Sequence, residues 1–278
     1  MRRGGRAAGL VRHAALAALA AVYLYPVALM VVGSLKPDAS VLPELATWRG
    51  LFPERVSLQN YRDVLARVDF LRYLASSAWI AAATVALGLA VNAPAGYALA
   101  RLRWRARRRA LAFVLALLVI PFEAVAVPLL YQVSWLGWRD TYTAQILPFA
   151  ASAFSIYLFY SFFLDLPRSL EEAARVDGAG PLRAFLLVAL PNARPALATC
   201  AVLTFLAQWG SFLWPLMVTS GERVRPLPVA LAAFHTLPPL AWGDILAFAV
   251  MMVAPVVVLF LLFQRWFVEG MAWTGARG

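Results

Sequence analysis

Long apolar runs alternate with short polar segments along the whole chain. Six runs rich in Ala, Leu, Val and aromatic residues stand near 14–33, 73–100, 110–131, 142–164, 196–218 and 245–267. A helix that crosses about 30 Å of hydrocarbon needs about 20 mostly apolar residues, and each run has that length. The pattern predicts an all-α membrane protein with six transmembrane helices in one domain, residues 14–278, after a short polar segment, 1–13.

Composition excludes an ordinary soluble domain. Hydrophobic residues make up 63% of the chain and charged residues 14%, against roughly 45–50% and about 25% in globular proteins. The first apolar run is longer than the apolar part of a signal peptide, about 7–15 residues, so a membrane span is favoured there. Arginine carries nearly all the positive charge, with Lys36 as the one lysine, which points to a bacterial genome rich in G and C.

The net charge of +11 does not indicate a nucleic-acid partner. The arginines form short clusters between apolar runs, which is typical of anchors at the cytoplasmic face of a bilayer.

Cys200 stands alone, and His13 and His235 have no metal-ligand companions, so no disulfide within the chain and no metal site are expected. The expected surroundings are a lipid bilayer, and the expected location is the bacterial cytoplasmic (inner) membrane.

Arginine asymmetry predicts the orientation. The short loop between the second and third runs holds six arginines, Arg101, Arg103, Arg105, Arg107, Arg108 and Arg109. Such a loop stays in the cytoplasm, and an even number of spans then places both termini there. The segment 35–72 would lie outside; it is expected to be either an ordered loop with short helices, where an external protein docks, or a simple connector.

The polar segment 165–195 has the pattern of a helix–turn–helix on the cytoplasmic side. Ser169 followed by Glu172 has the spacing of a capping box, which predicts a helix that starts just after Pro167. Glu171 and Arg175 stand four residues apart and are expected to form a surface ion pair.

The second half of this segment supplies the turn and the second helix. Gly178 and Gly180 are expected to allow the sharp turn, and Pro181 suits a first helical turn. An apolar helix over 182–190 should follow and stop at Pro191. The segment is therefore expected to be a compact, partly charged knob that a partner protein can approach closely.

Polar groups inside apolar runs are candidates for function, because each costs free energy in hydrocarbon unless it is paired. The candidates for a translocation path are Asn92, Glu123, Gln145 and Gln208, with the aromatic residues Trp209, Phe212 and Trp214. Hydrogen bonding between helices and anchoring at the membrane interface are the alternative roles.

Nothing in the sequence indicates an enzyme. No nucleophile–base pair or set of metal ligands converges at one depth, and there is no phosphate-binding G-x-x-x-x-G-K loop. The chain is therefore expected not to hydrolyse ATP by itself.

Three motifs in the knob carry a resemblance to a known family. Glu172-Ala173-Ala174, Asp177-Gly178-Ala179 and Leu190-Pro191 resemble the EAA loop of permease subunits of ATP-binding-cassette (ABC) importers. Similarity to the carbohydrate-type, maltose-like branch extends along the chain, at Asn60-Tyr61, Gly96-Tyr97-Ala98-Leu99-Ala100-Arg101, Ile120-Pro121-Phe122-Glu123 with Pro128, Ile146-Leu147-Pro148, Gln264-Arg265-Trp266-Phe267-Val268-Glu269-Gly270 and Gly275-Ala276.

The resemblance implies a type I ABC importer permease fold and several partners. These are a second, different permease chain, two ATPase subunits that bind ATP and Mg²⁺, and an extracytoplasmic solute-binding protein. It also implies that the knob docks on the ATPase through Glu171, Glu172, Ala173, Ala174, Asp177, Gly178, Ala179, Phe185 and Pro191. The implied function is to form half of the path of a sugar or sugar-like solute.

One departure from the family pattern leaves the solute open. The branch usually has an amide and an acid after the tryptophan of the fifth span, where this chain has Gly210 and Ser211. A glycerol phosphate ester, an amino acid or a peptide therefore remains an alternative solute, and an ion-coupled secondary transporter is an alternative class of protein.

Overall fold

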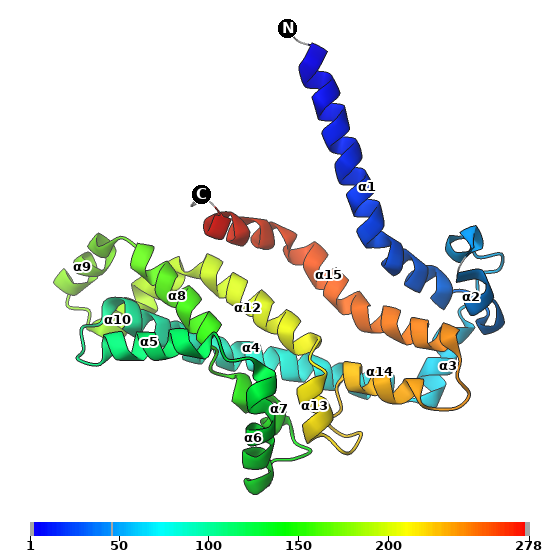
Figure 1. Cartoon of the computed structure of the whole chain (residues 1–278). Coiled ribbons are helices and arrows are strands. Elements are labelled where there is room, and N and C mark those ends of the chain that lie inside the picture. The colour runs from blue at the N-terminus through cyan, green and yellow to red at the C-terminus, as the bar shows by residue number, and fades with distance from the viewer. Residues whose placement is uncertain (1–2, 46, 276–278) are drawn as a thin grey trace. The chain divides into compact units, whose positions relative to one another are not determined.

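The computed structural model describes residues 3–45 and 47–275, and every regular element in this part of the chain is a helix (Figure 1). The α-helices are α1 (Arg3–Ser34), α2 (Asp38–Leu45), α3 (Gln59–Arg67), α4 (Phe70–Arg101), α5 (Arg107–Leu117), α6 (Phe122–Trp135), α7 (Tyr142–Ile146), α8 (Ala153–Asp165), α9 (Arg168–Val176), α10 (Pro181–Ala184), α11 (Leu190–Asn192), α12 (Arg194–Trp209), α13 (Leu213–Val218), α14 (Leu227–His235) and α15 (Trp242–Gly275). Two 3₁₀ turns, η1 (Trp48–Leu51) and η2 (Leu147–Phe149), and one π-helical segment, η3 (Phe185–Ala189), complete the list. The predicted all-α fold is confirmed.

Four helical stretches of the described chain are long and apolar enough to cross a membrane: Val11–Ser34, Phe70–Arg101, Tyr142–Asp165 and Trp242–Leu262. Two bent pairs of helices raise the number to six if each pair forms one span. The pair α5 and α6 bends by 102°, and the pair Pro181–Asn192 and Arg194–Trp209 bends by 76°. The predicted limits of the individual spans, and their orientation, stay predictions.

Three of the predicted runs are not single helices, and one of them, 142–164, is divided into α7, η2 and α8. The run 110–131 is divided between α5 and α6, with Pro121 at the N-cap of α6. Proline has no N–H to continue a helix and forces the residue before it out of the helical region. The run 196–218 stops at Trp209 and resumes as α13, where Pro215 lies in the first turn, a position that a proline tolerates.

The described chain divides into two compact units, the first within residues 1–70 and 230–257, and the second within 71–229 and 258–278. In the first unit, the predicted short helices of the segment 35–72 are present as α2, η1 and α3. The buried Asn60 amide donates to the carbonyls of Ser34 and Lys36, both at 2.8 Å. Lys36 is itself buried and pairs with Glu44 at 2.7 Å. These bonds make the segment after α1 an ordered structure.

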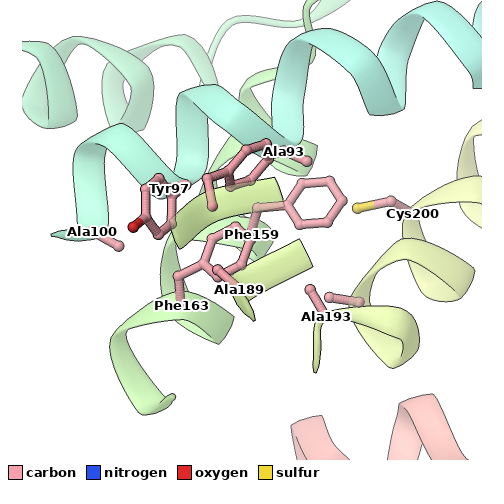
Figure 2. Close-up of a cluster of buried hydrophobic side chains, with 10 residues drawn as sticks. Ala93, Tyr97, Ala100, Phe159, Phe163, Ala189, Ala193 and Cys200 are labelled. Carbon is pink, nitrogen blue, oxygen red and sulfur yellow. The ribbon is translucent and has the colours of Figure 1, made fainter. Parts of the chain in front are cut away.

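In the second unit, α4, α8, η3 and α12 meet around a buried hydrophobic cluster (Figure 2). The ring of Tyr97 on α4 lies 5.4 Å from the ring of Phe163 on α8 and 5.0 Å from that of Phe185 on η3. Cys200 contributes from α12. The cluster joins the end of α4 to the elements that carry the segment 165–195.

Candidate functional site

The knob, residues 165–195, begins with a helix whose start differs from the expectation. Pro167 is the N-cap of α9, and no side chain caps the helix. The predicted capping box of Ser169 and Glu172 is therefore wrong. The chain is already helical at Arg168, so Ser169 lies inside the first turn, where it cannot take the N-cap role.

The turn of the knob depends on one glycine. Gly178 has a φ of +80°, a conformation that glycine adopts at little cost. Its N–H donates to the carbonyl of Arg175, and the N–H of Ala179 donates to that of Ala174, which together form a Schellman motif. Gly180 has a φ of −69°, so the expected need for glycine holds at Gly178 and not at Gly180.

The second helix of the knob continues past the proline that was expected to end it. Pro181 is at the start of α10, as predicted, but α10, η3 and α11 run on through Pro191 to Asn192. The N–H of Leu190 donates to the carbonyl of Phe185, five residues back. This wider turn accommodates the ring of Pro191, which has no N–H to place.

An ion pair that the sequence did not reveal anchors the knob. The Oε1 atom of Glu171 lies 3.2 Å from Nε of Arg101, the last residue of α4, and each side chain is only 5% exposed. Arg101 also donates to the carbonyl of Leu166, the C-cap residue of α8. The predicted pair of Glu171 with Arg175 is present at 3.9 Å, although only Arg175 lies on the surface.

The opposite face of the knob is exposed. Glu172, Ala173 and Asp177 all lie on the surface. On the two sides of the turn, Val176 is 88% exposed and Leu182 68% exposed. Large apolar side chains next to exposed carboxylates are typical of a surface that a partner protein covers.

Two of the predicted path residues are engaged inside the protein. Asn92 is buried; its amide donates to the carbonyl of Ala150 at 3.1 Å and accepts from the N–H of Ser152 at 3.0 Å. Asn92 thus satisfies both backbone groups at the break before α8. The buried Gln145 donates to the carbonyl of Val224 at 2.8 Å.

The aromatic candidates separate into buried and exposed residues. Trp214 is 1% exposed, donates to the carbonyl of Ala144 at 2.9 Å and packs against Phe122 and Phe149. Trp209 is buried and its ring stacks on Phe205 at 5.3 Å.

The remaining path candidates keep some accessibility. Phe212 is 42% exposed, and Gln208 is partly exposed. Glu123 is exposed in the first turn of α6, where a carboxylate is favoured by the helix dipole.

The first unit contains a cavity of about 490 Å³ between the segment that follows α1 and the start of α15. Asp38, Asp63 and Asp244 line it together with Arg67. Arg67 donates to Asp244 at 2.8 Å, and its guanidinium carbon lies 4.5 Å from the centre of the Phe234 ring. This ion pair ties α3 to the start of α15.

Residues 92–273 match the family described as "Binding-protein-dependent transport system inner membrane component". The chain belongs to this family of permeases. Members of the family are transmembrane subunits of ABC importers and are not enzymes themselves. The family that the knob motifs resembled is thereby confirmed.

Relatives of this permease support the same assignment. It is 32% identical to the arabinooligosaccharides transport system permease protein AraQ of Halalkalibacterium halodurans, over 94% of this chain and 93% of the relative. It is 33% identical to the trehalose transport system permease protein SugB of Mycobacterium tuberculosis, over 92% of this chain and 93% of the relative.

A solved structure shares the fold of the permease. The crystal structure of a bacterial ABC transporter involved in the import of the acidic polysaccharide alginate superimposes with a TM-score of 0.85 and 26% identity, over 96% of this chain and 99% of the other. The predicted type I ABC importer permease fold is confirmed. The side chains of the C-terminal motif, from Gln264 on, lie outside the described residues, and Ala276 lies beyond the described chain.

Proposed function

We propose that this permease is one of two transmembrane subunits of a bacterial ATP-driven importer for a sugar or sugar-like solute, located in the inner membrane. The names of the relatives, which transport arabinooligosaccharides and trehalose, support the solute class. The family description supports an inner-membrane importer that works with a solute-binding protein.

The knob is the surface on which the ATPase subunit docks. The observation that carries this proposal is its exposed face, where Val176 and Leu182 flank the turn at Gly178 and Glu172 stands beside them. The apolar side chains would enter a cleft of the partner, and Glu172 would pair with a basic residue there. The basic loop after α4 supports a cytoplasmic location for this face, together with the ATPase.

The solute path would open by alternating access. When the two ATPase subunits close on ATP, they draw the two permease knobs together, and the helices rock about a site near the middle of the membrane. The ATP and Mg²⁺ belong to the ATPase subunits. The solute-binding protein would dock on the opposite side, near α2 and α3, where the carboxylates around the cavity offer a surface for basic side chains.

Co-purification from native membranes tests the docking surface. The tagged permease, extracted in mild detergent, is expected to bring down an ATPase and a second permease, identified by mass spectrometry. Glu172→Arg places a positive charge on the docking face and is expected to lose the ATPase while it keeps the second permease. The matched control is Glu222→Gln, which changes an exposed carboxylate in a loop far along the chain from the knob.

Two results would overturn the proposal. If the wild-type permease brings down no ATPase under conditions in which it stays folded, the importer assignment of the complex fails. If Glu172→Arg retains the ATPase as well as Glu222→Gln does, the docking face is elsewhere. Uptake of labelled oligosaccharides, glycerol phosphate and amino acids by cells that carry the full complex then decides the solute class.

A further inference from the structure

A single guanidinium group connects three elements at the base of the knob. Arg101 is the last residue of α4, and it donates to the carbonyl of Leu166 where α8 ends. The same group pairs with Glu171, the fourth residue of α9, at 3.2 Å. The residues involved are 65 and 70 positions apart in the chain, so this contact joins a long apolar helix directly to the knob.

The burial of this pair sets it apart from the other ion pairs of the second unit. Both side chains are 5% exposed, whereas in the pair of Arg225 with Glu222 the carboxylate is 64% exposed. A buried charge is stable only while its partner stays close. Arg101 and Glu171 are therefore expected to move together when either helix moves.

The pair is not held by a directional hydrogen bond. The Nε atom of Arg101 and the Oε1 atom of Glu171 lie 3.2 Å apart, yet neither makes a hydrogen bond of acceptable geometry within the described chain. Attraction between charges depends on distance and only weakly on angle. The attraction between these two atoms is therefore mainly electrostatic, and it holds Glu171 of α9 against the end of α4.

A second contact, one turn earlier in α4, holds the end of this helix against α8 and η3. Tyr97 packs its ring against Phe163 of α8 and Phe185 of η3. Both halves of the knob are thus fixed to the same end of α4, the first half by charge and the second by packing. The neighbouring apolar cluster gives this base little room to deform.

We propose that the buried Arg101–Glu171 pair is the joint through which the knob passes its movement to α4. This inference rests on the proposed function of the knob, and Glu171 acts as a positioning residue that does not itself touch the ATPase. When the ATPase displaces the knob, the pair pulls the cytoplasmic end of α4 with it. Without the charge pair, the knob still docks, but only the packing of Tyr97 on Phe185 links it to α4, and less of its movement reaches that helix.

The test separates docking from transmission. In a Cys200→Ala background, a single cysteine replaces Ala90, an exposed residue of α4, and its reaction rate with a maleimide is measured in the complete complex with and without ATP. ATPase co-purification and ATP hydrolysis are measured on the same samples. No transported solute is needed for these measurements.

Glu171→Gln, which keeps the shape and removes the charge, is expected to retain co-purification and hydrolysis. The ATP-dependent change in maleimide rate should fall clearly below that of the wild type. The exchange Arg101→Glu with Glu171→Arg should restore it. If that double variant is not recovered, Glu171→Asp, which keeps the charge, should retain the response. Glu222→Gln is the control and should respond as wild type does.

Three outcomes would overturn the inference. The first is an unchanged ATP response in Glu171→Gln. The second is loss of ATPase co-purification in Glu171→Gln, because the pair would then serve docking. The third is identical behaviour of Glu171→Asp and Glu171→Gln, because charge would then be irrelevant. If the wild-type complex itself brings down no ATPase, or does not hydrolyse ATP, it is the proposed function that fails.

Discussion

Gly96→Ala is expected to destabilise the permease, because α4 and α8 lie too close at this residue to admit another carbon atom. A Cβ atom built on Gly96 would lie 2.5 Å from Cβ of Phe159, 2.8 Å from the backbone N of Tyr160 and 2.9 Å from the carbonyl O of Ile156. Ordinary contacts are 3.4–4 Å. Two of these three atoms belong to the backbone and cannot rotate out of the way. The helices must therefore separate by roughly 1 Å, and a gap of that size loses a quarter to a half of the dispersion energy of each contact.

The size of the effect follows from these contacts. Overpacking costs about 1–3 kcal/mol, and the backbone obstacles place Gly96→Ala in the upper half of that range. Alanine returns about 0.5–1 kcal/mol of helix preference, which leaves a loss of about 2 kcal/mol. For a chain of this size, a loss of 1 kcal/mol lowers Tm by about 2–4 °C, so a decrease of about 4–8 °C is expected.

Thermal unfolding in mild detergent, followed by tryptophan fluorescence, measures this change. The matched control is Gly88→Ala on the same helix, where the nearest atoms to a new Cβ are Asn92 Nδ2 at 3.5 Å and the Ala150 carbonyl at 3.7 Å. Gly88→Ala should leave Tm unchanged or slightly higher. If Gly96→Ala melts at or above the temperature of Gly88→Ala, the close approach of α4 and α8 is refuted.

Two further substitutions test the break before α8 and the turn of the knob. Asn92→Ala leaves the Ala150 carbonyl and the Ser152 N–H without their partner and is expected to cost about 1–3 kcal/mol for each unsatisfied group, measured as a lower Tm in the same assay. Gly178→Val forces a β-branched residue to a φ of +80°, which costs about 1–3 kcal/mol of backbone strain. This variant should therefore reduce ATPase co-purification. Gly180→Ala should not, because Gly180 has a φ of −69° and lies in open space.

Controls make these two results decisive. Asn192→Ala removes an exposed amide that donates to the Val188 carbonyl, one turn earlier in η3, so it should change Tm much less than Asn92→Ala. Equal effects of the two would show that the break before α8 does not depend on Asn92. Equal co-purification by the valine variant of Gly178 and the wild type would show that the Schellman turn is not required for docking.

The membrane fold could be predicted from run length and hydropathy, because lipid leaves only helices and closed barrels as solutions for an apolar chain. The breaks within the runs could not. Pro121 and Pro215 are visible in the sequence, but prolines also occur inside α1, α4 and α15 without ending the helix. Whether a proline bends a span depends on which neighbouring groups satisfy the freed backbone, and these come from distant residues.

In the knob, features set by nearby residues could be predicted from the sequence, whereas features set by contacts with distant residues could not. The start of α10 at Pro181 and a glycine turn before it could be expected from residue type, although residue type did not distinguish Gly178, with its positive φ, from Gly180. The burial of Glu171 could not be expected in this way, because its partner Arg101 is 70 positions away and belongs to a cluster of six arginines. The exposure of Val176 likewise depends on packing that the sequence of the knob does not contain.

The distribution of polar groups in the second unit narrows the search for residues that contact the solute. Asn92 has partners for both ends of its amide and Trp214 is buried with its N–H engaged, whereas Gln145 donates from Nε2 but has no partner for its buried Oε1 in the described chain. A buried polar group that already has its partner gains little from a solute and would lose the internal bond by turning toward it. Phe212 and Glu123 are exposed and keep their side chains available. Substitution of these two exposed residues is therefore the sharper test of solute contact, since changes at the buried ones alter stability and transport together.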